Sequence, residues 1–157
     1  MSAKSQFLKK LQEKQSRSAG FNTKAEADIA AFRQRISQLQ ASMETWLTGT
    51  EVRTETTTTS LVEFLIGGSA FSVPGIVLRY ETRNIRFTPI FLYGQGVTGC
   101  IEVCLAADDH IRPLYRLFMR FGERDDWTWC PAGARSNNPA LLDEEVFFTL
   151  ISPLLPE

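Results

Sequence analysis

The stretch DIAAFRQRISQLQASMETWL, residues 28–47, decides how the N-terminal third of the chain folds. Its large apolar residues recur in alternating steps of three and four, which predicts a helix with one apolar stripe. The repeat averages 3.5 residues, as in a coiled coil, and the stripe is narrower than a helix lying across a sheet usually has. We therefore predict a homodimer, with packing inside the chain as the alternative. The predicted dimer seam is Ile29, Phe32, Ile36, Leu39, Met43 and Trp46.

The residues before this stretch predict a second, shorter helix. Residues 1–48 contain no proline and are rich in helix-favouring Ala, Gln, Lys, Glu and Leu. Gly20 is a natural helix terminator, and Thr23 with Glu26 has the spacing of a capping box. We expect an N-terminal helical hairpin in residues 1–48, whose second helix runs from about residue 24 to residue 47.

Residues 51–157 form the second predicted domain, an antiparallel sheet with a C-terminal helix. Alternating β-branched and aromatic residues between short polar turns predict a meander of about six strands. Asp143 is placed to cap a short final helix, with Glu144 and Glu145 in its first turn. An apolar face predicts that this helix packs on the sheet, which makes the fold class α+β. That face consists of Val146, Phe147, Leu150, Ile151 and Leu154.

Composition and charge bear on whether the chain could span a membrane and on where in the cell it works. The N-terminus has basic residues without an apolar block behind them, and no apolar run is long enough to span a bilayer. Three cysteines, an odd number in a chain of 157 residues, predict reduced thiols and a cytoplasmic location. Residues 1–48 carry eight basic and four acidic side chains, whereas the rest carries nine and fourteen. The two parts therefore have opposite net charge.

No group of residues predicts a catalytic or metal site. Cys100 and Cys104 on one strand would stand about 13 Å apart, too far to bind one ion. The acidic clusters at 108–109 and 123–126 flank one strand, and roughly 27 Å separates them. His110 is the only imidazole, and no nucleophile motif or phosphate-binding glycine pattern accompanies it. We therefore predict no catalytic residues, no metal and no cofactor.

One face of the predicted sheet combines arginines with an aromatic residue. Arginine and aromatic side chains are typical anchors of protein interfaces, so this face is the predicted partner-binding surface. The alternative is an ordinary solvated face whose arginines pair with glutamates. The predicted surface consists of Arg79, Arg86, Arg116, Phe118 and Arg120.

These observations together predict a non-catalytic protein-binding module. We expect a small bacterial-type accessory, inhibitor or immunity-like protein that binds another protein and dimerises through its second helix. Two alternatives remain: an enzyme whose site forms across a dimer, and a nucleic-acid-binding protein. The basic residues that would contact phosphates in the latter are Lys4, Lys9, Lys10, Lys14 and Arg17.

Overall fold

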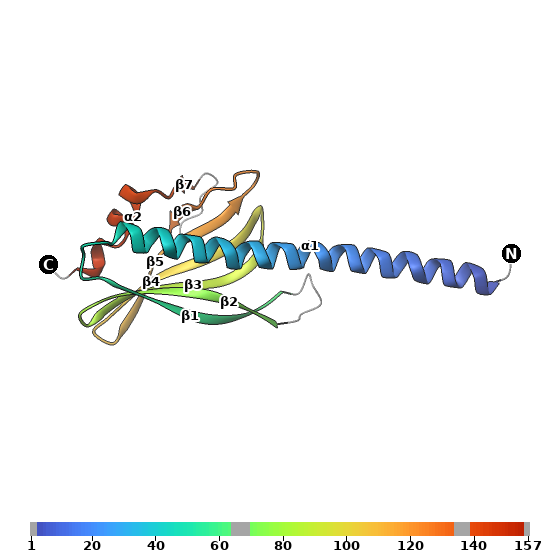
Figure 1. The fold of residues 1–157 in the computed structure, drawn as a ribbon, viewed down its shortest axis with the longest axis horizontal. Helices are drawn as coiled ribbons and strands as arrows, with labels where there is room; N and C mark the ends of the chain where they lie inside the picture. Colours follow the sequence, from blue (N-terminus) through green and yellow to red (C-terminus); the bar gives the residue numbers. More distant parts are fainter. Residues whose placement is uncertain (1–2, 64–69, 134–138, 156–157) are drawn as a thin grey trace.

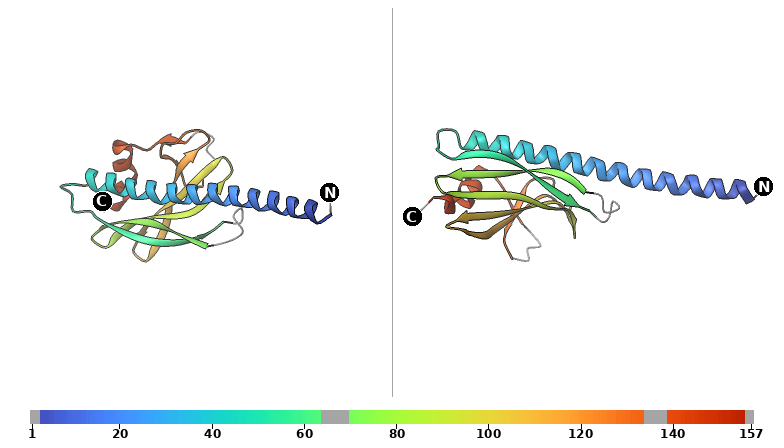
Figure 2. Two further views of the ribbon diagram at one scale, coloured as in Figure 1. Left: turned by 45° about the vertical axis from the view of Figure 1, so that its right-hand side comes forward. Right: turned by 90° about the horizontal axis from the view of Figure 1, so that it is seen from below.

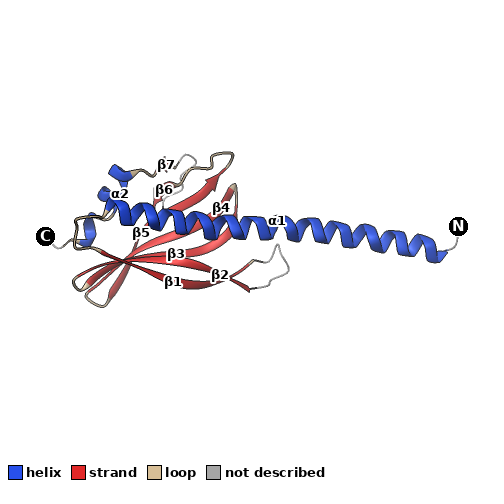
Figure 3. Ribbon diagram, in the orientation of Figure 1, coloured by secondary structure: helices blue, strands red, loops and turns tan. Residues whose placement is uncertain are grey.

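The computed structural model describes residues 3–63, 70–133 and 139–155, and only the backbone of residues 11–23. One long helix, α1 (Ala3–Trp46), crosses an antiparallel sheet (Figures 1 and 3) and lies on one side of its strands (Figure 2). A short helix, α2 (Glu144–Leu150), and the 3-10 turn η2 (Ser152–Leu154) follow the sheet. The strands are β1 (Arg53–Val62), β2 (Ala70–Tyr80), β3 (Arg83–Gly94), β4 (Val97–Ala107), β5 (His110–Phe121), β6 (Thr128–Pro131) and β7 (Ala140–Leu141).

The predicted α+β class and antiparallel sheet are confirmed, but the strand count differs. The described residues form seven strands, paired in chain order from β1 to β7, where the sequence predicted about six. The last strand has two residues, too few for a period-two pattern to reveal. The predicted turn at Asp108 and Asp109 joins β4 to β5, and both residues have positive φ, 53° and 64°. Such a turn matches the twist of the two strands that it connects.

The predicted helical hairpin is wrong, because α1 is one continuous helix of 44 residues. It runs through Gly20, and Thr23 lies inside the helix and not at a cap. A glycine in a helix interior costs only about 1 kcal/mol relative to alanine. The many strong helix formers around Gly20 outweigh that cost. The predicted C-terminal end is close to the observed one, since α1 ends at Trp46 and Gly49 has a φ of 86°.

The structure also corrects the predicted dimer seam, because the stripe packs against the chain's own sheet. Phe32, Ile36 and Met43 are completely buried, and they form one core with residues of β2 to β5. A side chain with no exposed surface inside one chain cannot contact a second chain. The whole stripe belongs to this core: Ile29, Phe32, Ile36, Leu39 and Met43 are buried in it, and the half-buried Trp46 packs against it.

A narrow stripe is sufficient here because polar side chains beside it bond to the sheet. On the β1–β2 side, Arg33 donates to the carbonyl oxygen of Ser72 over 2.8 Å. Thr56 and Thr54 donate to the side-chain oxygens of Gln40 and Glu44 on the same flank, each over 3.0 Å. These contacts occupy the helix surface where a wider apolar face would otherwise be needed.

The C-terminal helix follows its prediction. The side chain of Asp143 accepts a hydrogen bond from the backbone N–H of Val146 over 2.8 Å, which caps α2. Phe147 is buried in the same core as the α1 stripe, and its ring lies 5.1 Å from that of Trp46. α2 and the end of α1 therefore pack together at one end of the sheet.

Candidate functional site

Three of the four predicted arginines, Arg79, Arg86 and Arg116, do share one face of the sheet. Arg86 pairs in register with Val77 on one side and with Cys104 on the other, and these rows lie opposite the core. Arg79 forms an ion pair with Glu55 at 2.8 Å, and Arg116 lies 3.9 Å from a carboxylate oxygen of Glu102. This charge-paired arrangement is the one expected of a solvated face.

Phe118 lies on that face but is not available as an anchor. It is 8% exposed and packs with Cys100 and Cys130, while Phe91 and Phe121 cover part of the cluster. The aromatic member of the predicted surface therefore stabilises the outer side of the sheet.

Arg120 does not join the predicted surface, because its side chain reaches α1. One guanidinium nitrogen lies 3.5 Å from a carboxylate oxygen of Asp28, and another lies 3.3 Å from Asp125. The change of side occurs beside Gly99, whose φ of 77° departs from strand geometry. Sequence alternation assumes a regular strand and could not predict this departure.

Asp28 forms a buried polar contact that the sequence analysis missed. It is 8% exposed, and one of its carboxylate oxygens accepts a hydrogen bond from the Tyr93 hydroxyl. Burial first, then the neighbouring carboxylates of Asp28 and Glu63, raise the pKa of Tyr93. Tyr93 therefore stays protonated and serves as a donor that holds α1 on β3. An aspartate beside an apolar stripe was the available signal.

The three cysteines lie in or near the outer face of the sheet, where burial changes their protonation. Burial raises the pKa of Cys100 to about 12 and that of Cys104 to about 11, and it also raises the pKa of Cys130. All three cysteines are free thiols, which these shifts keep neutral. No group of three or more His, Cys, Asp or Glu residues in the described part of the chain is placed to hold a metal ion.

The acidic clusters considered from sequence lie at opposite ends of β5. Asp108 and Asp109 form the turn before it, and Asp125 and Asp126 follow it. Asp125 pairs with Arg35 of α1 at 3.0 Å, and the Arg35 guanidinium lies 5.6 Å from the centre of the Trp127 ring. The acidic cluster that follows β5 therefore fixes α1 to the sheet.

The clearest unpartnered apolar surface lies on α1 before it reaches the sheet. Figure 1 shows the N-terminal part of the helix extending beyond the strands, and we call residues 3–23 the α1 arm. Phe7 is 66% exposed and Leu8 is 49% exposed. Lys4, one turn earlier, is close to both, and Lys10 follows Phe7 by three residues. The side chains of Lys14 and Arg17 lie outside the described residues.

A second apolar surface lies at the opposite end of the molecule. A groove of about 470 Å³, which we call the base groove, opens between the end of α1, the start of β1 and the C-terminal turn. Its apolar lining includes Leu47, Val52, Tyr80, Phe148, Ile151 and Leu155.

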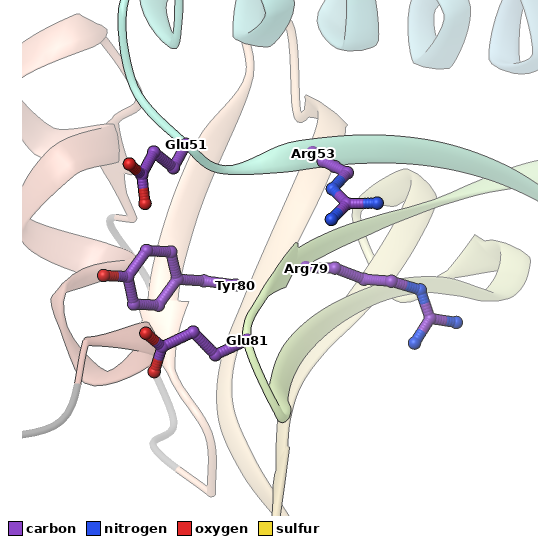
Figure 4. A pocket seen from close by; sticks show the side chains of 5 residues that line it. All are labelled: Glu51, Arg53, Arg79, Tyr80 and Glu81. Atoms are coloured by element: carbon purple, nitrogen blue, oxygen red, sulfur yellow. The ribbon is translucent and has the colours of Figure 1, made fainter.

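A depression of about 450 Å³ adjoins the base groove and shares Glu51 and Tyr80 with it; its other lining residues are Arg53, Arg79 and Glu81. Figure 4 shows the carboxylates of Glu51 and Glu81 on either side of the Tyr80 ring, with the guanidinium of Arg79 directed away from them. The depression thus combines two acidic groups with two arginines beside an apolar surface.

Comparison of the chain with protein-family models, curated proteins and solved structures finds no match. In the described part of the chain, no helix has the length and apolar character needed to cross a membrane.

Proposed function

We propose that the chain is a non-catalytic protein-binding module, and that the α1 arm is its recognition element. The carrying observation is the exposure of Phe7 and Leu8 on a helix that extends beyond the sheet. Helices commonly bind other proteins by placing an apolar face into a groove, and aromatic residues are enriched in such interfaces.

The arm is a better recognition element than the arginine face predicted from sequence. Phe118 is buried in that face, and Arg79 and Arg116 are each within ion-pair distance of a glutamate. An interface usually depends on a few large side chains that become desolvated on binding. Phe7 and Leu8 can do this without disturbing the core, and so we place the main contact there.

We propose a class of protein and a cellular compartment as well as a binding surface. A small accessory, inhibitor or immunity-like protein needs a stable body and an accessible binding element, and this chain combines the two. Three free thiols favour a reducing environment, and we propose that the protein works in the cytoplasm.

Capture of a companion from an extract of the source cell tests the proposal. The full-length chain should retain one stoichiometric protein, and a variant with Phe7→Glu and Leu8→Glu should lose it. The matched control is Ile111→Glu, because Ile111 is 63% exposed but lies on the body, in β5. Retention by the arm variant, or the absence of any companion, would overturn the proposal.

Nucleic-acid binding is the second candidate, favoured by the exposed Lys4, Lys9 and Lys10 on the same arm. Neutralisation of phosphates makes such binding steeply dependent on salt. Fluorescence anisotropy with mixed-sequence DNA and RNA should then show affinity that falls linearly with the logarithm of salt concentration. No change in anisotropy at low salt would eliminate this candidate.

A further inference from the structure

We propose that the α1 arm of one copy of this chain binds in the base groove of a second copy. This inference rests on the proposed function of the arm and names its partner. The arm exposes Phe7 and Leu8, and the groove offers an apolar lining that includes Val52 and Phe148. Its volume of about 470 Å³ lies within the usual range for binding pockets, about 300–1,000 Å³.

The charges around the two surfaces are complementary. Residues 3–23 carry five basic side chains and one acidic side chain. Among the described residues, Glu51 is the one charged residue that lines the groove, and Glu144 and Glu145 lie one turn before Phe148 on the same face of α2. In the adjoining depression Glu81 lies with Arg53 and with Arg79, which is paired with Glu55. An arm carrying Lys4 and Lys10 beside its apolar residues fits such a rim. Complementary charges of this kind steer association and fix its register.

The arm cannot occupy the groove of its own chain. Leu47, which lines the groove, is 40 positions after Phe7, and α1 is continuous from Phe7 to Trp46. At 1.5 Å per residue this stretch of helix spans about 60 Å. Figure 1 shows the same separation, with the N-terminus and the end of α1 at opposite ends of the molecule. Binding therefore joins two copies.

Contact between two different surfaces of the same chain is head-to-tail. Such contacts either close, with a reciprocal dimer as the smallest closed assembly, or continue into filaments. This differs from an arm-to-arm coiled coil, in which identical surfaces pair and the groove takes no part. The two arrangements respond differently to mutation of the groove.

Sedimentation velocity on two variants tests the inference. The arm variant carries Phe7→Glu and Leu8→Glu, and the groove variant carries Phe148→Glu and Leu155→Glu. Phe148 and Leu155 are 37% and 54% exposed, which makes the groove variant compatible with folding. Wild-type protein should form dimers or larger oligomers, and each variant alone should be monomeric. A mixture of the two should give a 1:1 dimer and nothing larger, since one intact arm meets one intact groove.

Three results would overturn the inference: monomeric wild-type protein at high micromolar concentration, a groove variant that still dimerises alone, or variants that do not combine. Monomeric wild-type protein would overturn this inference but not the proposed function, which the companion captured from the extract tests separately. The failure of the inference and the failure of the proposed function are therefore distinguishable.

Charge reversal tests the same contact without changing its apolar residues. Lys4→Glu with Lys10→Glu should raise the dissociation constant several-fold, and Glu51→Lys with Glu81→Lys in the partner copy should restore it. Lys9→Glu is the matched control, because Lys9 lies about 160° around the helix from Phe7 at 3.6 residues per turn. An equal effect of Lys9→Glu would contradict the assigned helix face.

Discussion

Replacing Ile36 by alanine tests whether the α1 stripe belongs to the core of a single chain. Ile36 has no exposed surface, and its truncation should leave a cavity between α1 and the sheet. Removal of a buried isoleucine side chain to alanine typically costs about 2–5 kcal/mol. Since domains are usually stable by only about 5–15 kcal/mol, the variant should lose a large part of its free energy of unfolding.

Phe7→Ala is the matched control on the same helix. Phe7 is larger than Ile36 but 66% exposed, and its loss should change the free energy of unfolding by no more than about 0.5 kcal/mol. Urea denaturation at submicromolar protein concentration, followed by tryptophan fluorescence, measures both values. The midpoint should fall for Ile36→Ala while the slope stays constant. Equal effects of the two substitutions would refute the assignment of the stripe to the chain's own core.

Three further predictions follow from particular contacts. Gly99→Ala should destabilise the fold by about 1–3 kcal/mol more than Gly96→Ala, because both glycines have positive φ but a Cβ at Gly99 would meet Met119 and Phe32 at 2.9 Å. Thermal unfolding measures this difference, and equal losses would contradict it. Asp143→Ala should cost about 1 kcal/mol by removing the cap of α2, and an unchanged urea midpoint would show that the cap contributes nothing. The free energy of unfolding should fall as pH rises above about 9, because the buried thiols lose their protons at lower pH in the unfolded chain than in the folded one. Cys100→Ala should make the fall of the free energy of unfolding with pH shallower. Denaturation curves measured across this pH range test this, and an equal pH dependence of the variant and the wild-type protein would contradict the buried, neutral thiol of Cys100.

Local signals in the sequence were sufficient for most of the sheet and the C-terminal helix. The turn at Asp108–Asp109 and the cap at Asp143 depend on residues close to one another in the chain, and both are observed. The predicted helix break at Gly20 is wrong because one glycine acts against the summed helix propensities of its neighbours. The local signal was real, but its energy was small beside that of the surrounding helix.

The sequence could not predict the geometry of the arginine face where long-range contacts decide it. Arg116 and Arg120 have the same parity in the sequence, yet Arg116 remains near Glu102 on the outer face and Arg120 contacts Asp28 on α1. The positive φ of Gly99 lies on the neighbouring strand, β4, where the sequence pattern of β5 gives no indication of it. Likewise, no local pattern places Asp28 beside Tyr93, because 65 residues separate them.

The extension of the α1 arm beyond the strands follows from a difference in length between α1 and the sheet. A helix of 44 residues spans about 66 Å, whereas the longest strands have 12 residues and span about 41 Å. About 25 Å of helix, or roughly 17 residues, therefore extends past the sheet. Phe7 and Ile36 are 29 residues apart and lie within about 20° of one another around the helix. They occupy the same face, which the sheet covers at Ile36 and leaves uncovered at Phe7. The apolar period predicts the face, but the length of the sheet determines which part of it stays exposed.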